Sequence, residues 1–525
     1  MRATKDNGMN TGLTTLVSLL LAGLLLLPAA LPPDAAAQTA PTRGGTLRVA
    51  LTGEPPTIDV HQTGATLVLN IAWHMVEGLF TLDKSFAIIP MLAEGYQIGS
   101  DRLTYTVKLR KGVPFHNGQE MTADDVVASL QRWGRLAATG KALFANVESV
   151  TAKDKYTVEL RTREISGIVL ASLANPNQMA AIYPKALIEP SGDKPIRDVV
   201  GTGPFQLKEW VPDRHIRMVR FEKYAALPGA PNGYGGRKVA YLDEVVFVPS
   251  SEPASRVLGV EAGDFDLADW IPSDSYERLV KVPKVKTVAV KPKEWIVAPF
   301  NTTAGRLFAR RELRQAAQAA IDSEKVMQAA IGRPDFYRLS PGLLFPEQVW
   351  HSTAGKELYN QKNPGKARDL LKKAGYGGEE IRWLTTKEYE WMYRSSLAAT
   401  QQLQDVGFKI KLDVVDWGTL LKNRKEYDVF VTGLVVYTDP TQVHVLNCSW
   451  IGWYCEDRHV AMMKELAGTT EFKARKALFD KIQAHFYEEA PALKFGDFFS
   501  LRIYRDTVQG FANMPELFVW NVSKL

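Results

Sequence analysis

The stretch from residue 388 to residue 434 constrains the fold more than any other part of the sequence. A helical pattern runs from about Glu388 to Val406 and ends at Gly407. The strand pattern KIKLDVV follows, then Asp416 as an N-cap before the helical WGTLLKNRK, then the strand pattern YDVFVTGL. Two strands that are joined through a helix run parallel when they share a sheet. The sequence therefore predicts an α/β fold with parallel strands in this half of the chain.

The other periodic segments are also a mixture of strands and helices. Alternating apolar residues predict strands in TLRVALTG, YTVKLRKGV and YTVELRT. Helix-start signals occur at Thr122, Asn363 and Thr470, and an alanine-rich helix with breaks spans residues 309–331. The segment PALKFGDFFSLRIYR near the C-terminus is expected to be extended.

The first 37 residues are typical of a cleavable secretory signal. Arg2 and Lys5 precede an apolar run from about residue 13 to residue 30, and three alanines favour cleavage after Ala37. Prolines interrupt the run below the ~20 apolar residues that a membrane span needs. This segment contains no cysteine that could carry a lipid. We therefore expect an exported, unlipidated protein that resides in the periplasm.

Cys448 and Cys455 are the only cysteines in the chain. An exported protein keeps its disulfides, and this spacing matches neither a redox motif nor a zinc motif. The sequence therefore predicts a structural disulfide, whose loop-closure contribution is about 2.5 kcal/mol. The bond would hold Trp450, Trp453 and Tyr454 in one loop. That loop either shapes a binding site or is only a surface loop that the disulfide stabilises.

Composition and motifs exclude several classes of function. The formal net charge of +6 is small for 525 residues and does not indicate nucleic-acid binding. The sequence has no G-x-S-x-G elbow, no H-E-x-x-H pair and no phosphate-binding loop, and its eight histidines are scattered. We therefore expect no enzymatic activity, no cofactor and no resident metal.

Five segments together resemble the extracytoplasmic solute-binding proteins of peptide/nickel-type ABC importers. They are RGGTLRVALTGEPPTIDVH, the long stretch from VEGLFTLDKSF to ASLQRW, GTGPFQLKEW with FEKYAALPGAP, APFNTTAGRLFARRELRQAAQAAIDSEKV, and NPGKARDLLKKAGY with LQDVGFKIKLDVVDW. Their order and spacing cover nearly all of the chain after the signal. The resemblance implies the two-lobed α/β fold of the large peptide-binding class, in which the solute is enclosed between the lobes.

The resemblance also implies a division of the chain into lobes. The first lobe is discontinuous and is expected at residues 44–85, 200–298 and 496–525. An extra subdomain of this lobe is expected at residues 86–199, and the second lobe at residues 299–495.

One position departs from the pattern of the peptide binders that this sequence resembles. Those proteins carry an Asp three residues before the acidic residue of a [DE]-P step, and that Asp neutralises the ammonium of the peptide. Here the step is Asp439-Pro440 and the matching residue is Val436. An enclosed ammonium without a counter-charge is costly, so either free-amine peptides are disfavoured or Asp439 takes over the role. Nickel-type members place a His where Thr441 stands, which leaves His444 as the one candidate contact for a metal chelate.

The remaining candidate ligand contacts are polar or aromatic. Lys387 falls near the segment where the dipeptide binders keep a basic residue for the ligand carboxylate. Tyr437 adjoins the altered step, and Trp417, Trp270 and Trp295 stand at the ends of extended stretches near the expected cleft. Aromatic walls with a few fixed polar groups suit a small carboxylated or amide-bearing solute, such as an unusual short peptide or an amino-acid conjugate.

The resemblance finally implies partners and a mechanism without turnover. Hinge closure would bury the solute, and the closed form would be presented to two membrane permease subunits served by cytoplasmic ATPases. The binding protein itself is expected to be a monomer. The alternatives are a nickel, metal-chelate or oligosaccharide binder of the same fold, or a ligand sensor without a transport role.

Overall fold

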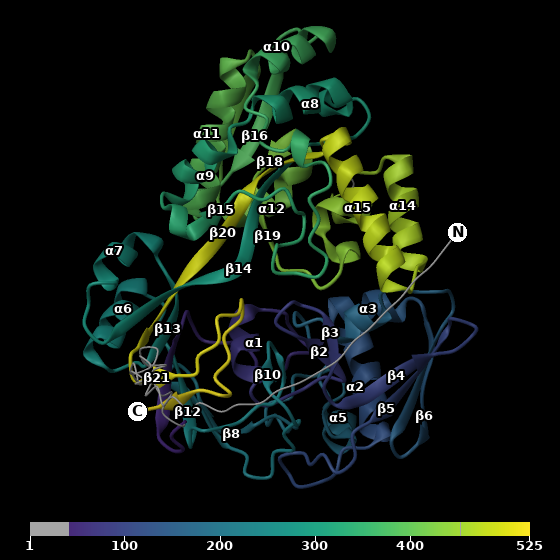
Figure 1. Cartoon of the computed structure of the whole chain (residues 1–525), viewed down its shortest axis with the longest axis vertical. Coiled ribbons are helices and arrows are strands. Elements are labelled where there is room, and N and C mark those ends of the chain that lie inside the picture. Colours follow the sequence, from purple (N-terminus) through teal and green to yellow (C-terminus); the bar gives the residue numbers. More distant parts are fainter. Residues whose placement is uncertain (1–40, 452) are drawn as a thin grey trace, which may run out of the picture. The chain divides into compact units, whose positions relative to one another are not determined.

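A nine-stranded sheet built from both ends of the chain organises the protein, whose computed structural model describes residues 41–451 and 453–525 (Figure 1). The predicted signal segment lies outside the described residues. Within the described ranges, no helix is both long enough and apolar enough to cross a membrane.

The strand order in this sheet is β19-β14-β20-β13-β1-β12-β9-β8, and β15 pairs with β20 at the side. The strands are β1 (Thr46–Leu51), β8 (Phe205–Val211), β9 (His215–Arg220), β12 (Glu244–Pro249), β13 (Leu267–Ile271), β14 (Val285–Pro299), β15 (Tyr337–Arg338), β19 (Thr432–Val435) and β20 (Ala492–Arg505). The predicted strand β1 pairs in parallel with both β12 and β13, and the predicted extended segment forms β20. Figure 1 shows that the long strands β14 and β20 join the part of the molecule around β12 and β13 to the part around β16 and β18.

A separate four-stranded antiparallel sheet has the order β4-β5-β7-β6. Its strands are β4 (Ala93–Ile98), β5 (Thr104–Leu109), β6 (Val147–Asp154) and β7 (Thr157–Thr162), and β5 and β7 are two of the strands expected from the sequence. Helix α2 (Ala123–Leu136) packs on it with Val126, Leu130 and Trp133 buried. The carboxylate of Asp125 accepts hydrogen bonds from the backbone N–H and the hydroxyl of Thr122, each at 2.8 Å, so the predicted helix start is confirmed.

The parallel strands predicted near residues 409–434 are confirmed in a three-stranded sheet of order β17-β16-β18. β17 (Lys409–Val414) and β18 (Val429–Phe430) do not touch, because β16 (Glu380–Thr385), which the sequence patterns did not indicate, lies between them. Helix α11 (Glu390–Asp405) precedes β17. α12 (Trp417–Asn423) follows it and begins where the Asp416 carboxylate accepts from the Thr419 N–H at 2.9 Å.

The helix starts of the second half follow the sequence at most positions. The alanine-rich stretch is two helices, α8 (Arg311–Ala320) and α9 (Ser323–Ile331), and Asn363 caps α10 (Pro364–Lys373). The prediction that Thr470 caps the last long helix is wrong. α15 (Phe472–Glu489) begins at Glu471, whose carboxylate accepts from the N–H groups of residues 473 and 474 at 2.8 and 2.6 Å. The remaining helices are α1 (Thr66–Ala72), α3 (Ala138–Phe144), α4 (Val169–Leu173), α5 (Lys185–Ser191), α6 (Pro253–Ala262), α7 (Tyr276–Leu279), α13 (Cys448–Ile451) and α14 (Asp457–Gly468).

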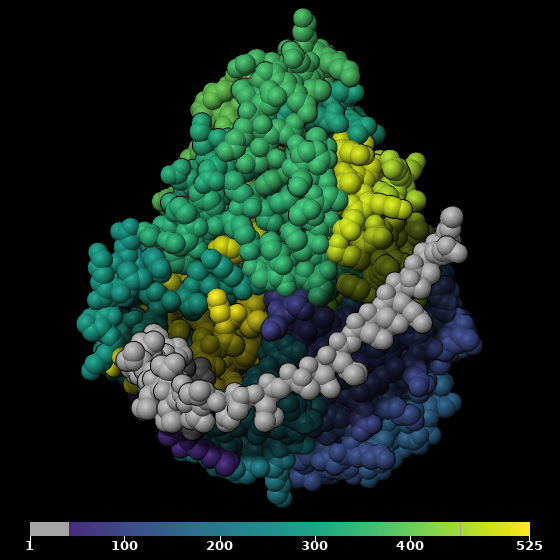
Figure 2. Space-filling view, in the orientation of Figure 1, coloured from purple at the N-terminus to yellow at the C-terminus, as the bar shows by residue number. Residues whose placement is uncertain are grey.

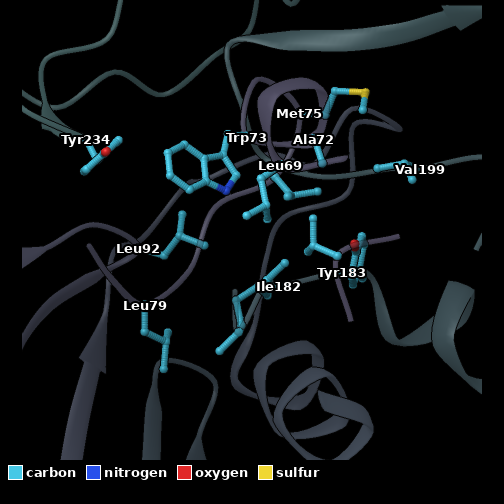
Figure 3. Close-up of a cluster of buried hydrophobic side chains, with 14 of the residues drawn as sticks. Leu69, Ala72, Trp73, Met75, Leu79, Leu92, Ile182, Tyr183, Val199 and Tyr234 are labelled. Atoms are coloured by element: carbon cyan, nitrogen blue, oxygen red, sulfur yellow. The ribbon is translucent and has the colours of Figure 1, made fainter. Parts of the chain in front are cut away.

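The largest hydrophobic core joins residues from the two ends of the described chain. Around α1, the side chains of Leu69, Ala72 and Trp73 pack with Tyr234, whose ring lies 4.8 Å from that of Trp73 (Figure 3). The C-terminal segment completes this core, because the Val519 N–H donates to Nε2 of a buried histidine after α1 at 2.9 Å. Figure 2 shows the purple N-terminal part and the yellow C-terminal part side by side on one face.

Candidate functional site

A cavity of about 1070 Å³ lies between two parts of the chain that are far apart in sequence. One wall is made by residues from the starts of α1 and α3 and from both sides of α4, and the other by the segment from the end of β19 to α14. Figure 1 shows α3 facing α14. The lining residues are Gly64, Thr66, Ala138, Thr139, Ala142, Ile168, Ser172, Asn175, Asn177, Val435, Tyr437, Thr441, Gln442, His444, Leu446, Asn447, Cys448, Ser449, Trp450, His459, Val460, Met463, Lys464 and Ala467.

Three rings form an aromatic wall in this cavity. The ring of His444 stacks on Trp450 with centroids 5.5 Å apart and planes 20° apart, and it meets the edge of Tyr437 at 5.4 Å. Burial and the nearby Arg424 lower the pKa of His444, so its imidazole is neutral at neutral pH. Burial raises the pKa of the Tyr437 phenol. The wall therefore offers flat uncharged surfaces, on which an apolar or planar part of a solute can pack.

The predicted disulfide between Cys448 and Cys455 is present and holds one end of this wall. Of the three aromatic residues that it encloses, only Trp450 faces the cavity. Trp453 and Tyr454 are buried and pack in two different hydrophobic clusters behind it. The bond thus fixes helix α13, which carries the cavity-facing indole.

The polar part of the lining consists mainly of amides and hydroxyls. Asn447 donates to the carbonyls of Thr441 and Val443, which leaves its amide oxygen available to the cavity. Lys464 is exposed and makes no ion pair with any residue that the structure describes. No aspartate or glutamate belongs to this lining.

Sequence reasoning missed Lys464, although a signal for it exists. Val460, Met463, Lys464 and Ala467 follow one another at the spacing of a single helix face, and all four line the cavity from α14. The pattern marks a shared face, but it does not say whether that face meets a core or a cavity.

Backbone contacts join the two walls beside the cavity. The Gly167 N–H donates to the Ala467 carbonyl at 2.6 Å, and the Arg475 guanidinium donates to the Gly167 carbonyl at 2.7 Å. Further out, the Val349 N–H donates to the Ser85 carbonyl at 3.0 Å. The cavity is therefore closed along one side by hydrogen bonds between segments that are otherwise separate in the fold.

The hypothesis that Asp439 meets the amino group of a ligand disagrees with its environment. Its side chain is 1% exposed and pairs with Arg475 at 2.9 Å. The same carboxylate accepts from the N–H of Thr441 at 3.0 Å and from its hydroxyl at 2.7 Å. With its oxygens occupied and no share in the cavity lining, Asp439 acts as a structural ion-pair partner and helix cap.

Val436 does not line the cavity either. The neighbouring Val435 and Tyr437 do, because side chains alternate between the two faces of an extended segment. Val436 instead packs between the largest core and the core that contains Tyr437. An aspartate at position 436 would enter this apolar contact rather than the cavity.

Two of the predicted tryptophans lie elsewhere. Trp295 is 1% exposed inside β14, with the ammonium of Lys494 4.9 Å from the centre of its ring. Trp270 ends β13 and packs against the ammonium of Lys293 at 4.7 Å. Neither belongs to the cavity lining, because both side chains are used as packing surfaces for buried lysines.

Lys387 and Trp417 are also outside the lining, in a cluster at the start of α11. Lys387 is exposed with its ammonium 4.9 Å from the ring of Tyr393, and Trp417 meets the edge of Tyr389 at 5.1 Å. The cluster continues from Tyr389 to Trp391, which packs on the sheet at β20.

His444 is one of two imidazoles in the lining, and the second, His459, donates from Nε2 to the Leu446 carbonyl at 2.7 Å. In the part of the chain that the structure describes, no three His, Cys, Asp or Glu side chains gather where they could hold a metal ion. The arrangement is a pocket, open on part of its surface, with aromatic, amide and cationic groups. It offers binding groups and no nucleophile paired with a base.

Comparison with known proteins agrees with this class of site. Residues 87–448 match the family described as "Bacterial extracellular solute-binding proteins, family 5 Middle". The chain belongs to this family, and it is the substrate-binding component of an ABC importer rather than an enzyme.

Three relatives illustrate the likeness. A probable peptide ABC transporter periplasmic-binding protein of Sinorhizobium fredii is 25% identical over 522 residues, which cover 93% of this chain and 95% of that protein. The structure of AgaA from A. tumefaciens in complex with agropinic acid is 26% identical, with a TM-score of 0.70 over 92% of this chain and 99% of the other. The structure of DppA from Helicobacter pylori in complex with the peptide STSA is 21% identical, with a TM-score of 0.72 over 92% and 98%. The last likeness concerns the fold alone.

Proposed function

We propose that the protein captures a small solute with a carboxylate and several amide or hydroxyl groups, such as a short peptide or an amino-acid conjugate. The observation that carries this proposal is the chemistry of the 1070 Å³ cavity. The Lys464 ammonium suits a carboxylate, Asn175 and Asn447 suit amides, and the rings of Tyr437 and Trp450 suit an apolar side chain.

The names of the relatives support the same solute class. One is described as a probable peptide ABC transporter component, another was solved with the peptide STSA, and a third was solved with agropinic acid. An oligosaccharide or a metal chelate would also enter a cavity of this size. No group of ligating side chains among the described residues favours the chelate.

We further propose the division into lobes given by the sequence. The four-stranded sheet with α2 would belong to the extra subdomain at residues 86–199, and the three-stranded sheet with α11 to the second lobe at residues 299–495. The long strands β14 and β20 would then be the two crossing segments. Closure about them would bring Gly167 against Ala467 over the bound solute.

The protein would work in the periplasm after removal of residues 1–37, without a lipid anchor and as a monomer. Its partners would be two permease subunits and their ATPases. The relatives that are described as periplasmic-binding proteins support this location.

A thermal-shift screen of the mature protein tests the proposal. The protein should first be unfolded and refolded, because such proteins carry bound solutes through purification. The panel should contain the peptide STSA, other di- to pentapeptides, amino-acid conjugates, agropinic acid, oligosaccharides, and nickel with and without histidine. A ligand at 1,000 times its dissociation constant adds about 4 kcal/mol to the free energy of unfolding, which produces a clear shift.

The wild type should be compared with a Lys464→Met variant. A hit among carboxylated solutes that weakens in the variant supports the proposal, and Lys476→Met, which removes a lysine that pairs with Asp480 away from the cavity, is the matched control. Hits confined to neutral sugars or to nickel would contradict the proposed solute class.

A further inference from the structure

Glu294 is a carboxylate that has no partner among the residues the structure describes, and it lies in β14 next to the cavity. It lies in β14, opposite Val435 of β19 on one side and opposite Phe498 of β20 on the other. Directly paired residues of antiparallel strands point their side chains to the same face. Glu294 therefore shares a face with Val435, whose side chain lines the cavity.

The surroundings of this carboxylate are aromatic and close. A Cβ atom placed on Gly433 would lie 2.5 Å from Oε2 of Glu294 and 3.1 Å from the ring of Trp391. The missing side chain at Gly433 thus makes room for the carboxylate and the indole together. The indole in turn packs against Phe498, with ring centroids 5.1 Å apart.

No ion pair and no hydrogen bond reaches the Glu294 carboxylate from any residue that the structure describes. The neighbouring Lys293 alternates to the other face, where its ammonium donates to the Pro515 carbonyl at 3.2 Å and lies 3.8 Å from Glu516. Burial raises the pKa of Glu294, the charge of Lys293 opposes this shift in part, and the charge of Glu516 adds to it. Glu294 nevertheless keeps partial exposure, so the carboxylate is enclosed and still reachable from solvent.

An enclosed carboxylate without a cation costs stability, because the charge loses hydration and gains no partner. Its electrostatic influence reaches the cavity, since Glu294 contributes to the raised pKa of Tyr437. The cavity lining itself contains no acidic side chain. Glu294 and Trp391 are not part of this lining themselves, and they adjoin it through Val435 and Gly433. A positively charged group of a solute that reaches past Val435 would find its counter-charge at Glu294, with the Trp391 indole beside it.

We propose that Glu294 is a specificity-determining residue that binds a protonated amine or a guanidinium of the solute, with Trp391 as the aromatic part of the same subsite. This inference rests on the proposed function and narrows it to solutes that carry a cation as well as a carboxylate. Lys464 and Glu294 would then bind opposite charges of one zwitterionic solute, and Glu294 would supply the charge that Val436 cannot.

The test uses the mature, refolded protein and three mixtures of tetrapeptides. The first mixture has free N-termini and contains no Lys, Arg or His. The second is the same mixture after N-acetylation. The third is N-acetylated, and each of its peptides contains a single Lys or Arg, placed at each of the four positions in turn. Peptides retained by the protein are identified and quantified by mass spectrometry, and the dissociation constants of the best binders are measured by calorimetry.

We expect the wild type to retain peptides from the first or third mixture in preference to the second. The Glu294→Gln variant should lose roughly 10- to 100-fold in affinity for those cationic peptides and should bind neutral ones as the wild type does. Without solute, the variant should melt at a higher temperature at pH 7, because it removes an unpaired carboxylate. If Glu294 had only a structural role, Glu294→Gln would melt at a lower temperature than the wild type. Gly433→Ala, which displaces the carboxylate without changing any charge, should repeat the loss of affinity.

Glu159→Gln is the control for the loss of a strand carboxylate away from the cavity, since Glu159 is a half-buried residue of β7 that pairs with Lys153 at 3.5 Å. Equal affinities of the wild type and Glu294→Gln for cationic peptides would overturn the inference and leave the proposed function standing. If the best-binding solute of the thermal-shift panel lacks any cationic group, the inference is likewise overturned and the proposed function stands. If no peptide mixture and no panel compound binds the wild type, the proposed function fails, and the inference fails with it.

Discussion

Replacing Gly167 with alanine should weaken solute binding by opening the cavity. Gly167 follows β7, and its backbone bonds to Ala467 and Arg475 on the opposite wall. A Cβ atom at this position would lie 1.9 Å from the Thr469 carbonyl oxygen and 3.1 Å from Nε of Arg475. The Thr469 backbone cannot yield by this amount, so the two walls must separate.

The size of the effect follows from the two bonds that are lost. A neutral backbone hydrogen bond contributes about 0.5–1.5 kcal/mol, and one from a charged guanidinium about 1.5–3 kcal/mol. Together they give about 2–4.5 kcal/mol in favour of the closed arrangement, which corresponds to a loss of roughly 30- to 2,000-fold in affinity if the solute binds only the closed form.

Calorimetry with the best solute from the screen measures this loss, and small-angle scattering measures the radius of gyration with and without the solute. Gly167→Ala should require more solute to reach the smaller radius. The free energy of unfolding should change little, since the two bonds lie between separate hydrophobic clusters. Gly95→Ala is the control, because a Cβ atom at Gly95 of β4 meets nothing within 4 Å.

The reasoning would be refuted if Gly167→Ala bound the solute within threefold of the wild type. The reasoning would also be refuted if Gly167→Ala lost much of its free energy of unfolding while its affinity for the solute stayed unchanged. In either case the contact between Gly167 and Ala467 would be permanent and unrelated to solute capture.

Three further changes test other parts of the structure. Replacing Cys448 and Cys455 with serine should lower the free energy of unfolding by about 2.5 kcal/mol and also weaken solute binding. If calorimetry finds the affinity unchanged, the disulfide stabilises the loop without shaping the binding site. The free energy of unfolding should fall in acid, because burial lowers the pKa of His116 from 6.5 to about 4. The loss begins as the pH drops below 6.5 and reaches about 2 kcal/mol at pH 5. In urea titrations, the free energy of unfolding of His116→Gln should depend less steeply on pH than that of the wild type. Arg475→Met should lower the free energy of unfolding in urea by about 3–5 kcal/mol, because Asp439 is left buried without its partner. Adding Asp439→Asn should restore part of this loss. A single variant as stable as the wild type would contradict the structural role of the pair.

Local chemistry could be predicted from the sequence, because its causes lie within a few residues of one another. The side chains of Asn363 and Asp416 accept from N–H groups three positions on, and at Thr122 the Asp125 carboxylate accepts from the N–H three positions back. The same proximity makes the disulfide predictable, since Cys448 and Cys455 have no other partner in the chain.

Predictions that required knowing which face of an element meets the cavity were less successful. Tyr437 and His444 line it, but Trp295 and Trp270 pack on lysines from distant strands, and Asp439 is occupied by an arginine 36 positions away. Local patterns indicate that a side chain is aromatic or acidic. They do not show whether another segment already occupies it.

The sequence by itself thus determined the class of fold, the parallel strands after residue 388, the helix starts at Thr122, Asn363 and Asp416, and the disulfide. Only the tertiary structure decided that Lys464 faces a cavity, that Gly167 meets Ala467, and that Glu294 lies beside aromatic rings with no ion pair to the described part of the chain. The physical reason is that a helix cap or a short disulfide loop depends on neighbours in sequence. A binding site depends on which groups remain unsatisfied after distant segments have packed, and that is settled only when the whole chain has folded.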